Sequence, residues 1–176
     1  ANVEFTNYTG EELLQMIEEN IDVLDETALL RAATLVKEDN KKVSLYKKAV
    51  EKFNSANGQY NLAVTYINMN NLADAKKALE NCEKDADWNN AMGVIALREN
   101  NLDAAAEYFA ASGNATAKAN LAIINILDGE YQAAAENLAG VKSANAVLAQ
   151  ILLGNYAPAA EFTCDSPLGA YLRAIA

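Results

Sequence analysis

Apolar residues recur along the middle of the chain at helical spacing, in blocks that lie on either side of a turn. Each turn precedes a Leu or Tyr, and these anchors are Leu72, Leu102, Tyr131 and Tyr156, separated by 30, 29 and 25 residues. Before the turn come apolar residues at positions i, i+1 and i+4, and after it come an Ala and a larger residue four positions apart. Such spacing places them on one face of a helix. The pattern therefore predicts helical hairpins that repeat along the chain.

Three consecutive hairpins show this pattern most clearly. Their first helices carry Leu62, Ala63 and Tyr66, then Met92, Gly93 and Ala96, then Leu121, Ala122 and Asn125, and their second helices carry Ala75 and Leu79, Ala105 and Phe109, then Ala134 and Leu138. We expect the small residues at fixed places to let two helix backbones approach closely. The larger side chains then fill the space around each contact.

The flanking segments extend the same arrangement. Thr27 to Val36 predicts a further first helix, Tyr46, Ala49 and Phe53 match the second-helix positions, and Ser166 with Pro167 predicts the start of one more first helix. We therefore predict one all-α domain over residues 1–176, a right-handed α-α superhelix of stacked antiparallel helix hairpins. It comprises an N-terminal capping helix within 1–24, about five hairpins within 25–165, and a truncated final helix within 166–176.

These residues resemble the tetratricopeptide repeat. That family places a large residue, a small residue and an aromatic residue on its first helix, then a Tyr or Leu, an Ala, and a Phe or Leu on its second. Three units match, from about Asn57 to Gly140. The family repeats every 34 residues or so and ends each unit with Pro. Here the period is shorter and that Pro is absent, so we expect shorter helices.

A second resemblance concerns location. The whole chain is similar to helical-repeat segments of Gram-negative envelope proteins, some of which carry a peptidoglycan-binding domain like that of outer-membrane protein A. This similarity implies a periplasmic or cell-envelope location, and it leaves the cytoplasm open. The chain begins with Ala1 rather than Met, from which we expect that it was cut from something larger.

The resemblance to the tetratricopeptide repeat also implies a site, because that family holds ligands on a concave face lined by first-helix side chains. The corresponding positions here are Tyr60, Asn61, Val64, Ile67 and Asn68, then Asn90, Ala91, Val94, Leu97 and Arg98, then Ala119, Asn120, Ile123 and Ile126. Their centre is a row of Val64, Val94 and Ile123 edged by Asn. Family members that grip a peptide carboxylate use Lys and Arg beside Asn, and those cations are lacking here.

Two interpretations of this row remain open. An apolar row flanked by amides suits an apolar helix or extended segment of a protein partner. Alternatively, the short helices curl tightly and the row packs against the second helices, which is the usual role of apolar stripes at helical spacing.

Composition narrows the remaining function classes. The net charge of −10 argues against nucleic acid and anionic lipid as partners, and no apolar run is long enough to span a membrane. No phosphate-binding Gly-rich loop and no nucleophile with an accompanying His occurs, because the chain has no His. We therefore predict no enzymatic activity, no cofactor and no metal site.

The two cysteines and the lysine-rich segment have structural interpretations. Cys82 and Cys164 lie on second helices three hairpins apart, too far for a disulfide, so we predict two thiols. Six lysines between Lys37 and Lys52 follow an acidic segment, and we expect these charges to balance each other. Asn at the turns Asn70-Asn71 and Asn100-Asn101 is expected to cap the following helix or to adopt the left-handed conformation.

Two functions follow from these patterns. The first is a non-catalytic scaffold that binds another protein or peptide through the concave first-helix face. The alternative is a structural spacer or assembly module within a larger cell-envelope protein. In that case Leu168, Leu172 and Ile175 on the unpaired final helix would expose apolar surface and allow self-association.

Overall fold

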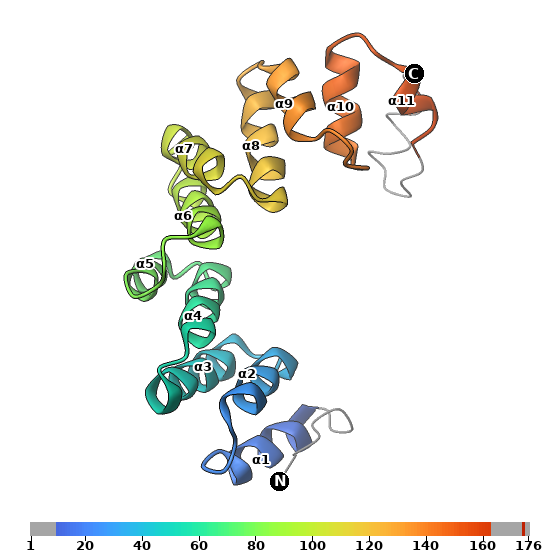
Figure 1. Cartoon of the computed structure of the whole chain (residues 1–176). Helices are drawn as coiled ribbons and strands as arrows, with labels where there is room; N and C mark the ends of the chain where they lie inside the picture. Colours follow the sequence, from blue (N-terminus) through green and yellow to red (C-terminus); the bar gives the residue numbers. More distant parts are fainter. Residues whose placement is uncertain (1–9, 163–173, 175–176) are drawn as a thin grey trace. The chain divides into compact units, whose positions relative to one another are not determined.

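The structure is a computed structural model that describes residues 10–162 and Ala174, and all regular secondary structure in that part of the chain is α-helical (Figure 1). The chain divides into two compact units, Ala1–Lys84 and Asp85–Ala176. Unit 1 contains α1 (Gly10–Asn20), α2 (Glu26–Leu35), α3 (Asp39–Phe53), α4 (Ala56–Asn68) and α5 (Leu72–Leu79). Unit 2 contains α6 (Ala86–Arg98), α7 (Leu102–Ser112), α8 (Ala115–Leu127), α9 (Tyr131–Asn137), α10 (Ala144–Leu152) and α11 (Ala157–Ala160).

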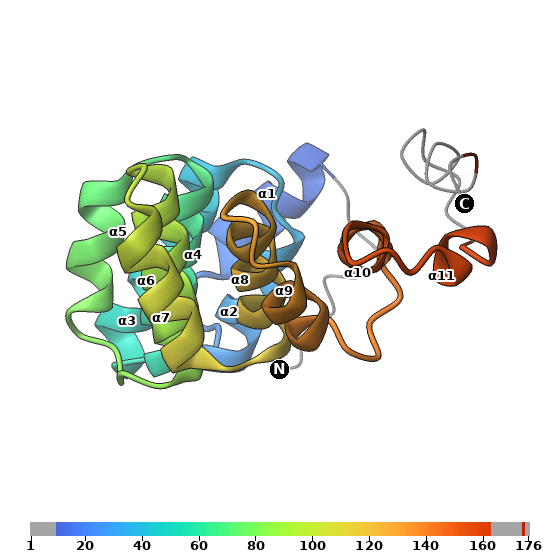
Figure 2. The same ribbon diagram turned by 90° about the horizontal axis from the view of Figure 1, so that it is seen from above.

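Helices that are consecutive in sequence pack as hairpins. In unit 1, α2 packs on α3, and α4 packs on both α3 and α5. In unit 2, each helix from α6 to α10 packs on the next, and α8 also contacts α6 and α10. Figure 2 shows α6 beside α7 and α8 beside α9. The second helices shorten along unit 2, from 11 residues in α7 to 7 in α9 and 4 in α11.

The close approach within the hairpin of α6 and α7 depends on Gly93. Phe109 of α7 is fully buried, and its ring lies directly against the backbone of α6 at this glycine. A Cβ atom at position 93 would lie 2.5 Å from Cε1 of Phe109 and 2.6 Å from its Cδ1. Phe109 also belongs to a buried cluster with Ala105 of its own helix and with Ala117 and Ile124 of α8. The glycine therefore makes room for the side chain that joins three helices.

In the turns between paired helices, two adjacent residues have different structural roles. Asn70 and Asn100 adopt the left-handed conformation, with φ of 58° and 60°, and Gly129 and Gly154 do so at the corresponding places in the next turns. In the two asparagine turns the residue that follows caps the next helix: Oδ1 of Asn71 accepts a hydrogen bond from the Asp74 amide at 3.4 Å, and Oδ1 of Asn101 accepts one from the Ala104 amide at 3.2 Å. Asn is one of the few residues with a side chain that tolerates the left-handed region, and it is also a strong N-cap. Both expectations for these asparagines are confirmed.

Asn125 of α8 shows a departure from the apolar pattern. The corresponding positions in the two preceding hairpins hold Tyr66 and Ala96, whereas Asn125 is a buried amide with 8% exposure. Its Nδ2 donates to Oε2 of Glu130 at 2.9 Å, and its Oδ1 accepts from Nδ2 of Asn137 at 3.0 Å. Because both the nitrogen and the oxygen of the amide are hydrogen-bonded, its burial costs little free energy. The two hydrogen bonds link α8 to Glu130 in the turn and to Asn137 of α9.

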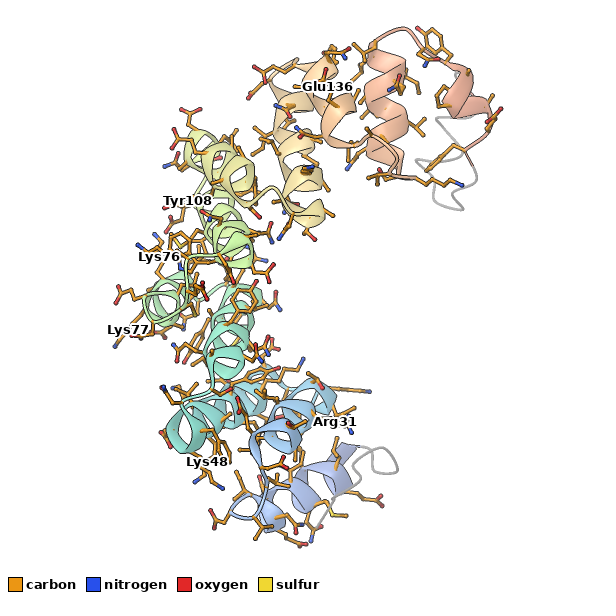
Figure 3. All side chains as sticks on the ribbon, viewed as in Figure 1. Arg31, Lys48, Lys76, Lys77, Tyr108 and Glu136 are labelled. Atoms are coloured by element: carbon orange, nitrogen blue, oxygen red, sulfur yellow. The ribbon has the colours of Figure 1, made fainter. Side chains whose placement is uncertain are left out.

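Lysines on one face of α3 hold the N-terminal segment of unit 1. Nζ of Lys41 lies 3.4 Å from Oε1 of Glu18, and Nζ of Lys48, which is labelled in Figure 3, lies 3.9 Å from Oδ1 of Asp22. Nζ of Lys52 donates to the Asp22 carbonyl at 3.0 Å, just past the end of α1. A cation at this place stabilises carbonyl groups that no helical N–H can reach. The basic segment thus balances the acidic one that precedes it, as expected.

Replacing Gly93 by Ala should lower the free energy of unfolding of unit 2 by about 1–3 kcal/mol, because the added methyl group meets a rigid, fully buried ring. This loss should exceed the gain of about 1 kcal/mol that Ala brings as a better helix former. Urea unfolding followed by fluorescence of Trp88, the single tryptophan, measures the change, since its ring contacts that of Tyr108 at 6.0 Å. Adding Phe109→Leu to Gly93→Ala should partly restore stability, because the smaller side chain makes room for the methyl group. If the effects of the two substitutions on the free energy of unfolding simply add, the proposed contact is contradicted.

Asn100 and Asn101 should respond differently to substitution. Asn100→Gly should leave the free energy of unfolding unchanged or raise it, while Asn100→Ala should lower it by about 1 kcal/mol, because only the second change penalises the positive φ. Asn101→Ala should lower it by about 1 kcal/mol through loss of the cap. The same Trp88 assay tests all three, and equal losses for Asn100→Gly and Asn100→Ala would show that backbone conformation is not the cause.

Candidate binding surface

The structure distributes the predicted site residues over both units. Those between Tyr60 and Asn68 lie on α4 in unit 1, and the others lie on α6 and α8 in unit 2. The two sets therefore form two separate surfaces, one on each unit.

In unit 2, the predicted amides of neighbouring first helices meet. Nδ2 of Asn120 on α8 donates to Oδ1 of Asn90 on α6 at 3.4 Å. Both side chains are half-buried. The hydrogen bond places the faces of α6 and α8 that carry these residues next to each other. It also leaves each amide with further hydrogen-bonding groups, since a primary amide has two N–H donors and an acceptor oxygen with two lone pairs.

Apolar side chains follow the amides along each helix. On α6, Val94 and Leu97 lie four and seven residues after Asn90, and on α8, Ile123 lies three residues after Asn120, so that each set shares a helical face. Leu97 is 38% exposed and Ile123 is 43% exposed. Val94 is half-buried and packs against the Phe109 cluster. The face thus contains both packed and exposed apolar groups.

Leu127 belongs to the same face and was missed in the sequence analysis. It lies seven residues after Asn120 and four after Ile123, and its exposure of 68% makes it the most exposed of the large apolar residues on α8. The helical spacing was the available signal. We name the set of Asn90, Val94, Leu97, Asn120, Ile123 and Leu127 the α6–α8 face. Arg98 is exposed at the end of α6, while Ile126 is half-buried and packs against the cluster around Ala122 and Leu138.

In unit 1, α4 places its predicted residues at different depths. Tyr60, Asn61 and Val64 are half-buried, and Asn68 is exposed. Ile67 is only 5% exposed, so it contributes to the core of unit 1. Thr65, a neighbour on the same helix, donates its hydroxyl hydrogen to the Asn61 carbonyl at 2.8 Å.

Charge is sparse on the first helices of unit 2. Between them, α6 and α8 carry only Asp87, Arg98 and Lys118, and Oδ1 of Asp87 accepts a hydrogen bond from Nδ2 of Asn114 at 3.1 Å. The acidic side chains lie on other elements, such as Glu107 on α7. This uncharged strip of apolar and amide groups on α6 and α8 suits apolar ligands with exposed peptide groups better than ions.

In unit 1, burial raises the pKa of the Tyr46 phenol, which lies in the core.

Residues 10–162 offer little other chemistry. No cluster of three or more potential metal-ligating His, Cys, Asp or Glu side chains occurs there. No helix in the described part of the chain is both long and apolar enough to cross a membrane. Cys82 is half-buried with its thiol 3.6 Å from the Ala78 carbonyl, and Cys164 lies outside the described residues, so the prediction of two thiols stays a prediction.

Comparison with known proteins identifies the fold. No protein-family model matches the chain, and a search of curated proteins gives no match either. Among solved structures, the chain is similar to YrrB, described as a tetratricopeptide-repeat protein with an unusual peptide-binding site. That similarity has a TM-score of 0.58 and 18% identity, and it covers 93% of this chain and 98% of YrrB.

A second solved structure is the APC/C hetero-tetramer Cut9-Hcn1. One of its chains matches with a TM-score of 0.68 and 15% identity over 94% of this chain and 39% of that chain. At this level of identity the similarities establish the fold alone. The predicted fold class and the resemblance read from the repeat motifs are confirmed: in fold, this chain is a tetratricopeptide-repeat-like helical-repeat protein.

Proposed function

We propose that the chain is a non-catalytic scaffold that binds a protein partner, and that the α6–α8 face takes an apolar segment of that partner. The observation that carries the proposal is the joint position of exposed Leu97, Ile123 and Leu127 beside the hydrogen-bonded pair Asn90 and Asn120. Apolar side chains of a partner would bury the exposed groups. The amides would receive its peptide N–H and C=O groups, which would otherwise lose their hydrogen bonds to water.

The fold supports this proposal without specifying a ligand. Folds of the tetratricopeptide-repeat kind are typically scaffolds without catalytic activity, and YrrB is described as having a peptide-binding site. Function nevertheless belongs to a site rather than to a fold, so the α6–α8 face has to be tested directly. Tyr60, Asn61, Val64 and Asn68 of α4 offer similar groups on unit 1 and form a second surface for the same tests.

A different observation favours the alternative function, a spacer or assembly module within a larger cell-envelope protein. Large apolar side chains are exposed near the C-terminal end of unit 2: Val141, Leu152, Leu153 and Tyr156. Apolar surface at the end of a helical stack favours association with a further helix or a second molecule. The residues proposed for self-association, Leu168, Leu172 and Ile175, lie outside the described residues. Sedimentation equilibrium over a wide concentration range measures self-association.

The depth of each apolar residue predicts which substitutions preserve the fold. Val94→Asp should lower the free energy of unfolding by about 2 kcal/mol or more, because it brings a charge against the Phe109 cluster. Ile123→Asp should change it by less than about 1 kcal/mol, because its side chain already contacts water. Urea unfolding followed by Trp88 fluorescence measures both. Equal large losses would favour the interpretation that the row only packs against second helices.

Ile123→Asp should weaken binding of apolar peptides at least about tenfold, because it places a charge in the desolvated centre of the interface. Peptides selected on the wild-type chain from a displayed random library serve as probes, and fluorescence anisotropy gives their affinities. Leu153→Asp is the matched control, since Leu153 has 42% exposure against 43% for Ile123 and lies outside the α6–α8 face.

The two variants separate the outcomes of this selection. Loss of binding with Ile123→Asp and retention with Leu153→Asp support the α6–α8 face. Peptides that bind both variants as tightly as the wild type, or a library that yields no binder, would refute it.

A further inference from the structure

A pocket of about 240 Å³ lies in unit 1 and is lined mainly by residues of α3, α4 and α5. Its apolar lining consists of Leu62 and Tyr66 of α4 and Ala78 of α5, which are at most 9% exposed. The exposed side chains of Lys47 on α3 and Lys77 on α5 also line it. We call this space the α3–α5 pocket. Small-molecule sites usually combine such an apolar lining with a few polar groups.

The α3–α5 pocket is distinct from the surface that α4 offers to a protein partner. Leu62 and Tyr66 line the pocket, whereas Val64 lies two positions from each of them and points about 160° away around the helix axis. Three helices hold the pocket, because α4 packs on both α3 and α5, and Nε2 of Gln59 donates to the Ala78 carbonyl at 2.8 Å. The space is therefore built by the packing of unit 1.

The two lysines of the pocket have charges that the protein itself does not use. Neither Lys47 nor Lys77 forms an ion pair or a hydrogen bond with another described residue, whereas the next residue on α3, Lys48, pairs with an aspartate. Asp74 also lines the pocket, and its Oδ2 accepts a hydrogen bond from Nδ2 of Asn71 at 2.7 Å. Two lysines and one aspartate leave a single net positive charge, which matches a monoanion.

The phenol of Tyr66 supplies a further unused donor. Its hydroxyl forms no hydrogen bond with any group in the described part of the chain. Every fully buried side-chain nitrogen or oxygen atom in that part has a partner, so this hydroxyl remains accessible although Tyr66 is only 9% exposed. Because Tyr66 lines the pocket, its hydroxyl is available to a ligand there. Hydrogen bonds from a hydroxyl to a carboxylate are short and strong.

The distribution of charge also favours an anion at this place. α3 carries five lysines and two acidic side chains, and α5 carries two lysines and one acidic side chain. The second helices α7 and α9 of unit 2 carry acidic side chains and no Lys or Arg. In a chain with a net charge of −10, α3 and α5 thus form a local basic region, which attracts anions.

We propose that the α3–α5 pocket binds a small organic carboxylate, a free molecule with one carboxylate group on an apolar body. The ammonium groups of Lys47 and Lys77 pair with the carboxylate, and the Tyr66 hydroxyl donates to it. The apolar body packs against Leu62 and Ala78. The volume of the pocket corresponds to about eight water molecules, which is room for one aromatic ring or a short alkyl chain beside the carboxylate.

The test titrates the ¹⁵N-labelled full chain with hydrocinnamate and follows the amide resonances of Leu62, Tyr66 and Ala78 by NMR. Lys47→Gln with Lys77→Gln should weaken binding at least about fivefold, because it removes both cations from the pocket. Lys42→Gln with Lys76→Gln is the matched control, since it removes the same charges from α3 and α5 outside the pocket; Lys76 and Lys77 leave α5 in different directions (Figure 3). It should weaken binding less than about twofold.

Tyr66→Phe tests the proposed donor separately. It should weaken binding of hydrocinnamate about threefold or more, because one hydrogen bond to a charged group is lost. It should leave the free energy of unfolding of unit 1 nearly unchanged, since the hydroxyl has no partner within the described residues. Urea unfolding followed by far-UV circular dichroism measures stability and shows that each variant is folded. Unchanged affinity in this variant would overturn the role of Tyr66.

Four results would overturn the proposal as a whole. The neutral analogue hydrocinnamamide could bind as tightly as the acid, or the two lysine double variants could weaken binding equally. Hydrocinnamate at about 20 mM could shift none of the pocket amides, although a ligand with a Kd near 1 mM would then nearly saturate its site. An N-acetylated peptide that ends in the same aromatic carboxylate could bind more than about tenfold tighter than the free acid, which would assign the pocket to a polypeptide instead.

Discussion

The contact between a small residue on one helix and a large residue on the next is the constraint on which unit 2 depends. Phe109 can be fully buried against α6 only because Gly93 has no side chain. The same ring then packs with Ala117 and Ile124, so a single aromatic side chain links α6, α7 and α8. Ala122, Ala134 and Leu138 form the corresponding contact one hairpin later. Dispersion contacts at this distance are lost steeply when backbones separate, so the small residues set the spacing of the stack.

This packing also determines which residues remain available for a ligand. The inner faces of α6 and α8 pack against neighbouring helices, and residues such as Ile95 and Ile124 are buried. Leu97, Ile123 and Leu127 lie on the side that the second helices do not cover. The hydrogen bond between Asn90 and Asn120 holds that side together without burying it. The proposed binding function therefore uses the part of each first helix that packing leaves exposed.

The lengths of the second helices explain the features at the C-terminal end of unit 2. A long second helix such as α7 covers its first helix and completes a core, whereas α11 covers only part of α10. Each hairpin of a helical stack is stabilised mainly by its contacts with the neighbouring hairpins.

Local patterns in the amino-acid sequence predict the helical hairpins, their boundaries at the asparagine turns, and the small and large residues that pack between them. These features depend on local spacing, φ preferences and capping, which are legible over a few residues. The depth of each apolar side chain becomes visible in the folded chain alone, because helical spacing does not distinguish buried Ile67 from exposed Ile123. The tertiary structure also decided the partners of the buried amide of Asn125 and the pairing of Asn90 with Asn120. Side-chain depth and these amide pairings depend on how neighbouring helices pack. That packing is determined jointly by residues that are distant from one another in the sequence.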